Sequence, residues 1–347
     1  MTTLDFSSAE LTKIITHHVG NKAREEDLSL SVELTEVADE SKEVLIKHFV
    51  SSVNIDEWFS FDLSREGGNE VHAIASELFA DPGKFIESSK QLSRLLYDQS
   101  NHPKIKEGQF NVVLFSNVIL DNERMTVFGL FKSENAVPFI KMKQGRVNFS
   151  ITHDSGFEVA GADKGCLIFN KEGEDGFKIL IADRTNRSEE ARYWRDDFLK
   201  VAPVRDEFHQ TKQAISVTSG FLKDRLPEEF NINKADQIDL INRSLNYFKG
   251  NDTFNKNDFE QSVLQDNELI RSFRMFEQGF RNENNIESLD EFDISQQAVK
   301  RQTRFLKSVL KLDKNFHIYI HGNRELIQQG VESNGRKFYK IYFEKEA

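Results

Sequence analysis

The sequence predicts an α+β protein in two parts. We expect a mixed domain of helices and antiparallel strands over residues 1–202, followed by a mainly helical region over residues 203–347 that ends in a basic helix and a β-hairpin. Strand-like apolar runs separated by turn residues predict the first part, and a change to a 3.6-residue apolar period after Pro203 predicts the second. With 347 residues and 30 Phe, the chain is long enough to form two domains.

Helices in the first part are predicted over residues 8–18, 38–51, 71–79, 84–97 and 189–199. The third and fourth form a pair that Asp81-Pro82-Gly83 interrupts, because proline and glycine end helices. The last begins with Glu189 and Glu190, and acidic side chains are favoured in a first helical turn.

Strands in the first part are predicted over residues 28–34, 110–120, 125–132, 166–170 and 177–183. Asp121-Asn122 supplies the turn of one hairpin and the polar run KEGEDG supplies the turn of another. In the last strand Phe177, Ile179 and Ile181 alternate with Lys178, Leu180 and Ala182. At least one face of the sheet should therefore be buried, and the other is not strongly polar.

The second part shows helical spacing twice, in Ile238, Ile241, Leu245 and Phe248 and again in Leu269, Phe273, Phe276 and Phe280. Residues 281–293 are polar and predict an exposed connector. The last fifty residues predict one helix followed by strands, with Asn334-Gly335 as a two-residue type I′ turn in the final hairpin.

The composition excludes several classes of protein. Mean hydropathy is -0.55, and no apolar run approaches the ~20 residues of a membrane span. The N-terminus lacks the basic and unbroken apolar regions of a secretion signal, so we expect a cytoplasmic protein without membrane association. The lone Cys166 can form neither an internal disulfide nor a cysteine-based zinc site.

The charge is distributed unevenly. The whole chain carries a formal net charge of -11, yet residues 296–347 carry +6 and residues 1–295 carry -17. A basic tail on an acidic body indicates a partner of negative charge.

A helix predicted over residues 297–312 holds most of this positive charge. At 100° per residue, five cations fall in one stripe less than a quarter-turn wide: Lys300, Arg304, Lys307, Lys311 and Lys314. Such a row could follow a phosphate backbone without reading sequence, whereas a merely solvated helix face is the simpler interpretation. Further cations that could assist are Arg301, Arg324, Arg336 and Lys337.

Sites for chemistry are poorly supported. His317, Tyr319 and His321 should share one face of a strand, but the two histidine Cα atoms would lie about 13 Å apart, too far to share one metal ion easily. This aromatic face could instead lie beside a nucleic-acid backbone. Asp183, Asp196 and Asp197 could contribute to a two-metal nuclease site, although no lysine-containing pattern completes it. We therefore predict no cofactor, no metal site and no catalytic residue.

Several segments together resemble the bacterial 37-kDa nucleoid-associated protein family, the YejK/NdpA-like proteins. They are KGCLIFNKEGEDGFKILIADRTN (164–186), EEARYWRDDFL (189–199), the residues Asp206, His209, Thr211 and Lys212, KADQIDLINRSLNYFK (234–249) and LDKNFHIYIHGNRELIQQG (312–330). Arg192-Tyr193 and Phe198-Leu199 are similar to the centre of the family pattern. The resemblance covers most of the chain and implies a place in the nucleoid and DNA binding, with no catalytic residues.

The charge pattern and the resemblance lead to one hypothesis. The chain is expected to bind double-stranded DNA through its basic segment 296–347, weakly, with strong salt dependence and largely without sequence preference. Residues 1–202 would then serve homodimerisation or partner binding. Two alternatives stay open: a module that docks an acidic protein partner, and a metal-dependent nuclease or phosphoesterase.

Overall fold

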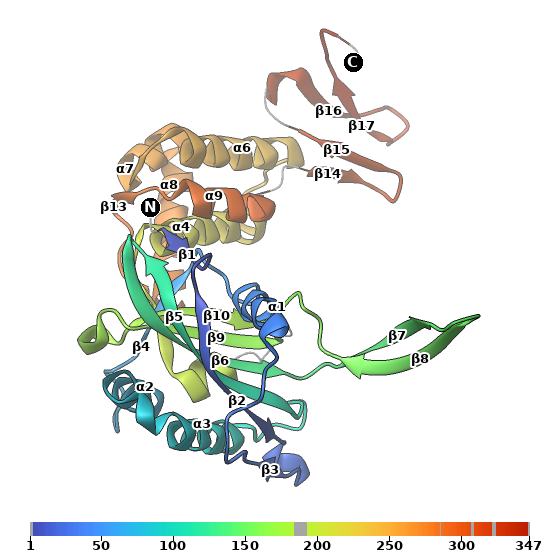
Figure 1. Ribbon diagram of the computed structural model, residues 1–347. Coiled ribbons are helices and arrows are strands. Elements are labelled where there is room, and N and C mark those ends of the chain that lie inside the picture. Colours follow the sequence, from blue (N-terminus) through green and yellow to red (C-terminus); the bar gives the residue numbers. More distant parts are fainter. Residues whose placement is uncertain (1–2, 184–192, 285, 307–308, 321–323, 346–347) are drawn as a thin grey trace. The chain divides into compact units, whose positions relative to one another are not determined.

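The computed structural model describes residues 3–183, 193–284, 286–306, 309–320 and 324–345. The chain divides into two compact units, Met1–Val204 and Arg205–Ala347, and its elements are labelled in Figure 1. An N-terminal sheet with helices and a helical C-terminal unit with β-hairpins confirm the predicted α+β class.

The first unit is built on one antiparallel sheet with the strand order β11-β4-β10-β9-β6-β5-β2-β3, to which β1 adds by pairing with β5. Its strands are β1 (Leu4–Asp5), β2 (Glu10–Val19), β3 (Leu28–Ser29), β4 (Trp58–Phe61), β5 (Gly108–Leu120), β6 (Glu123–Ser133), β9 (Lys164–Phe169), β10 (Lys178–Asp183) and β11 (Val201–Pro203). A separate pair is formed by β7 (Val137–Gln144) and β8 (Phe149–Gly156).

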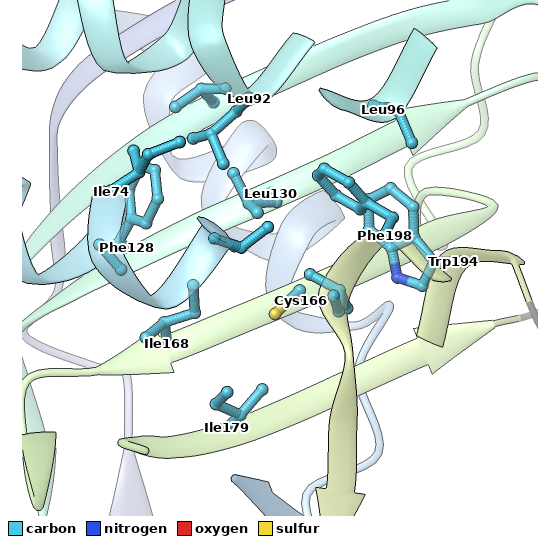
Figure 2. Packing of buried hydrophobic residues seen from close by; sticks show 14 of the residues in the cluster. Ile74, Leu92, Leu96, Phe128, Leu130, Cys166, Ile168, Ile179, Trp194 and Phe198 are labelled. Carbon is cyan, nitrogen blue, oxygen red and sulfur yellow. The ribbon is translucent and has the colours of Figure 1, made fainter. Parts of the chain in front are cut away.

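Both faces of the large sheet are covered. The helices are α1 (Asp39–Val50), α2 (Glu70–Ala80), α3 (Phe85–Gln99) and a π-type segment, Tyr193–Leu199. On one face Phe128 and Leu130 of β6 share a core with α2, α3 and Trp194, whose packing Figure 2 shows. On the other face Val127 and Phe131 of the same strand share a core with α1. Burial on both faces explains why these strands read as nearly continuous apolar runs.

The helix predicted over residues 8–18 is wrong, because this segment is strand β2. Leu11, Ile14 and Ile15 are spaced like a helical face, but a β-bulge between Leu11 and Lys13 shifts the register, and the two isoleucines pack into opposite cores. The β-branched side chains that crowd this segment favour a strand.

Other predictions in the first unit are confirmed or shortened. The helices over 38–51, 71–79 and 84–97 and the four strands between 110 and 183 are confirmed by α1, α2, α3, β5, β6, β9 and β10. Of the strand predicted over 28–34, only Leu28–Ser29 pairs with a neighbour. The helix predicted over 189–199 is present from Tyr193, and its first four positions lie outside the described residues.

The second unit is a helical bundle followed by two hairpins. Its helices are α4 (Glu207–Gly220), α5 (Leu226–Glu229), α6 (Lys234–Gly250), α7 (Lys256–Phe259), α8 (Asn267–Asn284) and α9 (Gln296–Gln302), with π-type turns at Phe221–Arg225 and Glu260–Leu264. Its strands are β12 (Thr253–Asn255), β13 (Glu291–Asp293), β14 (Val309–Leu312), β15 (Phe316–Tyr319), β16 (Ile327–Val331) and β17 (Lys337–Ile341). The two apolar stripes predicted from the 3.6-residue period, on α6 and α8, face one core, except for Ile238, which packs in a second, smaller core.

Two predictions in the second unit need correction. The connector over 281–293 is shorter than predicted, because α8 runs to Asn284 and β13 pairs with β12, burying Phe292. The basic helix over 297–312 is also wrong in extent. Helix α9 ends at Gln302, a 3₁₀ turn covers Thr303–Leu306, and β14 begins at Val309, where Leu310 and Leu312 alternate with Lys311 at strand period.

The final hairpin is confirmed, but its turn is not the predicted two-residue type. The Gly335 N–H donates to the Glu332 carbonyl at 2.9 Å and the Glu332 N–H donates to the Arg336 carbonyl at 2.8 Å. Gly335 has φ of +83°, and Asn334 does not adopt positive φ. The loop is therefore a three-residue one, a turn closed by a glycine in the left-handed region, which is the usual alternative to type I′.

Candidate nucleic-acid interface

The first part of the basic segment is anchored by helix α9. The Ser295 side chain accepts a hydrogen bond from the Ala298 N–H at 3.3 Å, which caps the helix N-terminus. Ala298 and Val299 are buried in the unit. Lys300 and Arg301 follow them on the exposed side of this short helix.

The hairpin β14–β15 presents one apolar and one basic aromatic face. Leu310 is 1% exposed and shares a small core with Ala235 and Ile238 of α6. Since strand side chains alternate between faces and Lys311 pairs with His317 in the register, these two lie on the opposite face. Tyr319 lies on that same face and is 64% exposed. A cation, an imidazole and a phenol ring therefore line one exposed strip.

The hairpin β16–β17 adds a second exposed mixture of cations and aromatic rings. Ile327 and Tyr339 attach it to the same core as Leu310. The Lys340 Nζ lies 5.0 Å from the centre of the Tyr342 ring, a cation–π contact. A Cβ at Gly330 would come within 2.4 Å of the Phe338 ring, so glycine is what lets this ring lie over the strand.

The predicted cations are brought to hairpins and turns instead of one helical row. Lys311 is on β14, Lys314 in the turn after it, and Arg336 and Lys337 where β17 begins, all exposed. Arg304 and Arg324 lie in 3₁₀ turns, and their side chains are outside what the structure describes, as is the whole of Lys307. The row of five cations on one helix face is therefore wrong, because the helix ends before Arg304.

Four exposed lysines in this region are available to a ligand. Within the described ranges of the second unit, the side chains of Lys300, Lys311, Lys314 and Lys337 form no ion pair with a carboxylate. In the first unit, by contrast, most of the described cations form ion pairs. Lys171, for example, pairs with Glu123, and Lys178 pairs with Glu172. Cations without a carboxylate partner can bind phosphates, and the exposed aromatic rings near them can stack on bases.

The histidine prediction is confirmed in part. His317 and Tyr319 share a face of β15, whereas His321 lies outside the described residues. For the alternative nuclease site, Asp196 is tied to Arg195, whose Nε donates to its Oδ1 at 2.6 Å. The described part of the chain holds no group of three or more His, Cys, Asp or Glu side chains placed to bind a metal ion.

A cluster of charges inside the first unit was not predicted. Lys132 of β6 and Lys164 of β9 are directly opposite one another in the register and are at most 1% exposed. The Lys132 Nζ contacts the Glu134 carboxylate at 3.1 Å, the Lys106 carbonyl at 2.5 Å and the Tyr193 hydroxyl at 3.4 Å. Burial lowers the pKa of Lys132, and Glu134 acts in the opposite direction.

The hydrogen bonds of the Lys132 ammonium group indicate that this internal cluster has a structural role. An ammonium group has three donors, and the three partners of the Lys132 Nζ use all of them. The Tyr193 hydroxyl also donates to Glu134 at 3.2 Å. In the sequence, a lysine after the apolar run FGLF reads as the solvated end of a strand, so no signal reveals its burial.

The first unit is thus an antiparallel sheet covered by helices, and the second is a helical unit whose terminal hairpins carry exposed lysines. The family model of the nucleoid-associated protein YejK matches residues 15–336 of the 347-residue chain. The chain therefore belongs to this family, as the resemblance in its sequence predicted. The family is one of nucleoid-associated proteins and not a known enzyme family.

None of the curated proteins with which the chain was compared matches it. No helix within the described ranges is long and apolar enough to cross a membrane.

Proposed function

We propose that this chain is a non-catalytic, nucleoid-located protein that binds double-stranded DNA through its C-terminal basic surface. The residues proposed to contact DNA are Lys300, Arg301, Arg304, Lys307, Lys311, Lys314, Arg324, Arg336 and Lys337, of which Lys307 lies outside the described residues. The observation that carries the proposal is the exposed strip of Lys311, His317 and Tyr319 on β14–β15. Lys300, Lys314 and Lys337 are also exposed and, within the described ranges, form no ion pair with a carboxylate. Membership of a nucleoid-associated family supports the same function.

The binding mode follows from the chemistry of the surface. Lysine side chains on exposed hairpins meet phosphates as point charges, which fixes position along a duplex without reading bases. The remainder of the chain, residues 1–295, carries -17 and repels DNA elsewhere. Affinity should therefore be modest, insensitive to sequence and steeply dependent on salt.

The test is the binding of a fluorescein-labelled 30-bp duplex to the full chain, measured by anisotropy at 50 mM salt. The variant Lys311→Gln/Lys337→Gln should bind at least about tenfold more weakly, because two phosphate contacts are lost. The control Lys47→Gln/Lys249→Gln removes two exposed lysines elsewhere and should bind like the unmodified chain.

Three outcomes would overturn the proposal. Equal loss of affinity in both double variants would show that only net charge matters. Displacement of the duplex by a small excess of polyglutamate would favour an acidic protein partner instead. Cleavage of supercoiled plasmid in Mg²⁺ or Mn²⁺ would replace the non-catalytic function with that of a nuclease.

A further inference from the structure

Strands β7 and β8, with the loop between them, form a ribbon that we call the arm (residues 137–156). The two strands pair with each other over eight positions and with no other strand of the described chain. Every residue of β7 and all but the last of β8 are exposed. Figure 1 shows the arm as a ribbon of its own beyond the end of β6.

The register gives the arm two chemically different faces. Paired residues lie on the same side of a two-stranded ribbon, and successive residues alternate between sides. One face carries Lys141, Lys143 and Asp154, and the Lys141 Nζ contacts the Asp154 carboxylate at 2.5 Å. The other face contains no acidic or basic side chain other than His153. It is formed by Pro138, Ile140, Met142, Gln144, Phe149, Ile151, His153 and Ser155.

The uncharged face is strongly apolar and uncovered. The exposed fractions of its four large side chains are 67% for Ile140, 71% for Met142, 63% for Phe149 and 66% for Ile151. An isolated two-stranded ribbon is marginally stable in water and requires a third strand or a packed face. A contiguous apolar strip of this kind marks a surface that another molecule covers.

The uncharged face of the arm suits only some kinds of binding partner. DNA would contact the opposite face, where Lys141 and Lys143 lie, because phosphates require cations. Edge-to-edge pairing along β7 is blocked at Pro138, which has no backbone N–H to donate. The covering partner must therefore present an apolar, uncharged strip of similar length to the face itself.

We propose that the partner is a second copy of this chain, and that two arms pack their apolar faces together across a two-fold axis. The row formed by Met142 and Ile151 would lie at the axis, so the row of one arm that holds Phe149 would face the row of the other that holds Ile140 and His153. No like charges meet in this arrangement, and the lysines stay on the outer faces. The same patch serves both copies, as a closed dimer requires.

The size of the face sets the strength of the dimer. Eight residues at about 3.3 Å each give an arm about 26 Å long. Two such ribbons bury much less surface than a standard protein interface, which buries at least about 1,200 Å².

Antiparallel arms also bring the tip residue Val147, which is 95% exposed, to the base of the partner's arm. An apolar pocket of about 330 Å³ lies there, lined in part by Val44, Phe157 and Val159. We expect a reversible dimer with a micromolar dissociation constant.

The first test is sedimentation velocity of the full chain without DNA, from 1 to 100 µM. The mass should rise from monomer to dimer across this range. Met142→Lys/Ile151→Lys places two charges on the apolar face and should keep the chain monomeric at 100 µM. Ser150→Lys/Thr152→Lys places the same two charges on the other face of the same ribbon, so it should dimerise normally.

The second test is oxidative cross-linking, which is clean because the only native cysteine, Cys166, is buried. Met142→Cys lies at the proposed axis and should form a disulfide-linked dimer, whereas Thr152→Cys on the outer face should not. A monomer at 100 µM, a dimer that survives Met142→Lys/Ile151→Lys, or equal cross-linking of both cysteine variants would overturn the proposal. Because no DNA is present, none of these outcomes depends on the proposed DNA binding.

Discussion

Buried His17 makes the stability of the first unit depend on pH. Its side chain is 1% exposed. Its Nδ1 accepts a hydrogen bond from the Ser31 N–H at 3.0 Å, and its Nε2 lies 2.9 Å from the Ser89 hydroxyl. The Ser89 hydroxyl already donates to the Ile86 carbonyl, so the neutral imidazole with its proton on Nε2 satisfies every partner. Burial, assisted by the charge of Lys90, lowers the pKa of His17 from 6.5 to about 4.

The sign and size of the effect follow by linkage. In the folded chain His17 stays neutral, whereas in the unfolded chain it is protonated below about pH 6.5. Above pH 6.5 both states are neutral at this residue, so the full unfolding free energy is present there. Part of it is lost as the pH falls from 6.5 towards 4. At pH 5 the loss amounts to about 2 kcal/mol of unfolding free energy.

The assay is urea unfolding followed by tryptophan fluorescence, which reports the first unit because Trp58 and Trp194 both lie in its cores. Between pH 7.5 and pH 5, His17→Gln should lose about 2 kcal/mol less than the unmodified chain. The control His18→Gln removes the neighbouring imidazole, which is partly exposed, and should retain the loss of about 2 kcal/mol that His17 causes. Equal pH dependence in the unmodified chain and in His17→Gln would refute the reasoning.

Two ion pairs whose carboxylates are buried give further predictions. Glu134→Gln removes the carboxylate that pairs with the buried Lys132, which faces Lys164 in the register, and should lower the unfolding free energy by about 3 kcal/mol. Lys132→Met/Glu134→Gln should recover most of this loss, because it also removes the buried ammonium group. Both are measured by the same urea assay, and no recovery in the double variant would contradict this. Arg274→Ala leaves the fully buried Glu260 unpaired and should cost about 2 to 3 kcal/mol, whereas Glu260→Leu should cost less because Arg274 is 54% exposed and regains water. Urea unfolding followed by circular dichroism measures both losses. A larger loss for Glu260→Leu than for Arg274→Ala would contradict this prediction, because the ion pair would then stabilise the fold by more than the burial of Glu260 costs.

The elements that could be predicted from sequence are those whose local signals agree with their packing. The stripe of Phe273, Phe276 and Phe280 gave α8 because one face of that helix packs on a core. Segments with conflicting signals could not be predicted correctly. The β-bulge after Leu11 gives strand β2 an apolar spacing that resembles that of a helix. The strand-like alternation of Leu310, Lys311 and Leu312 lies within a row of cations at helical spacing, which favours the wrong element.

Of the candidate site, the cations could be found from the sequence but not their arrangement. The concentration of charge after residue 295 is a property of composition, so it needs no fold. The grouping of Lys311 with His317 and Tyr319 depends on a strand register that only pairing sets. The arm was missed for a similar reason, since the apolar face of Ile140 and Met142 shows only once β7 and β8 are aligned.

The most direct test of DNA binding by the C-terminal surface is the salt dependence of duplex affinity for the full chain. If about four phosphates are contacted, the logarithm of the association constant should fall with a slope of about -3.6 against the logarithm of salt, so affinity drops roughly a hundredfold between 50 and 200 mM. Lys311→Gln/Lys337→Gln should reduce that slope by about 2. No binding at 50 mM salt, or a slope that the variant leaves unchanged, would contradict the account.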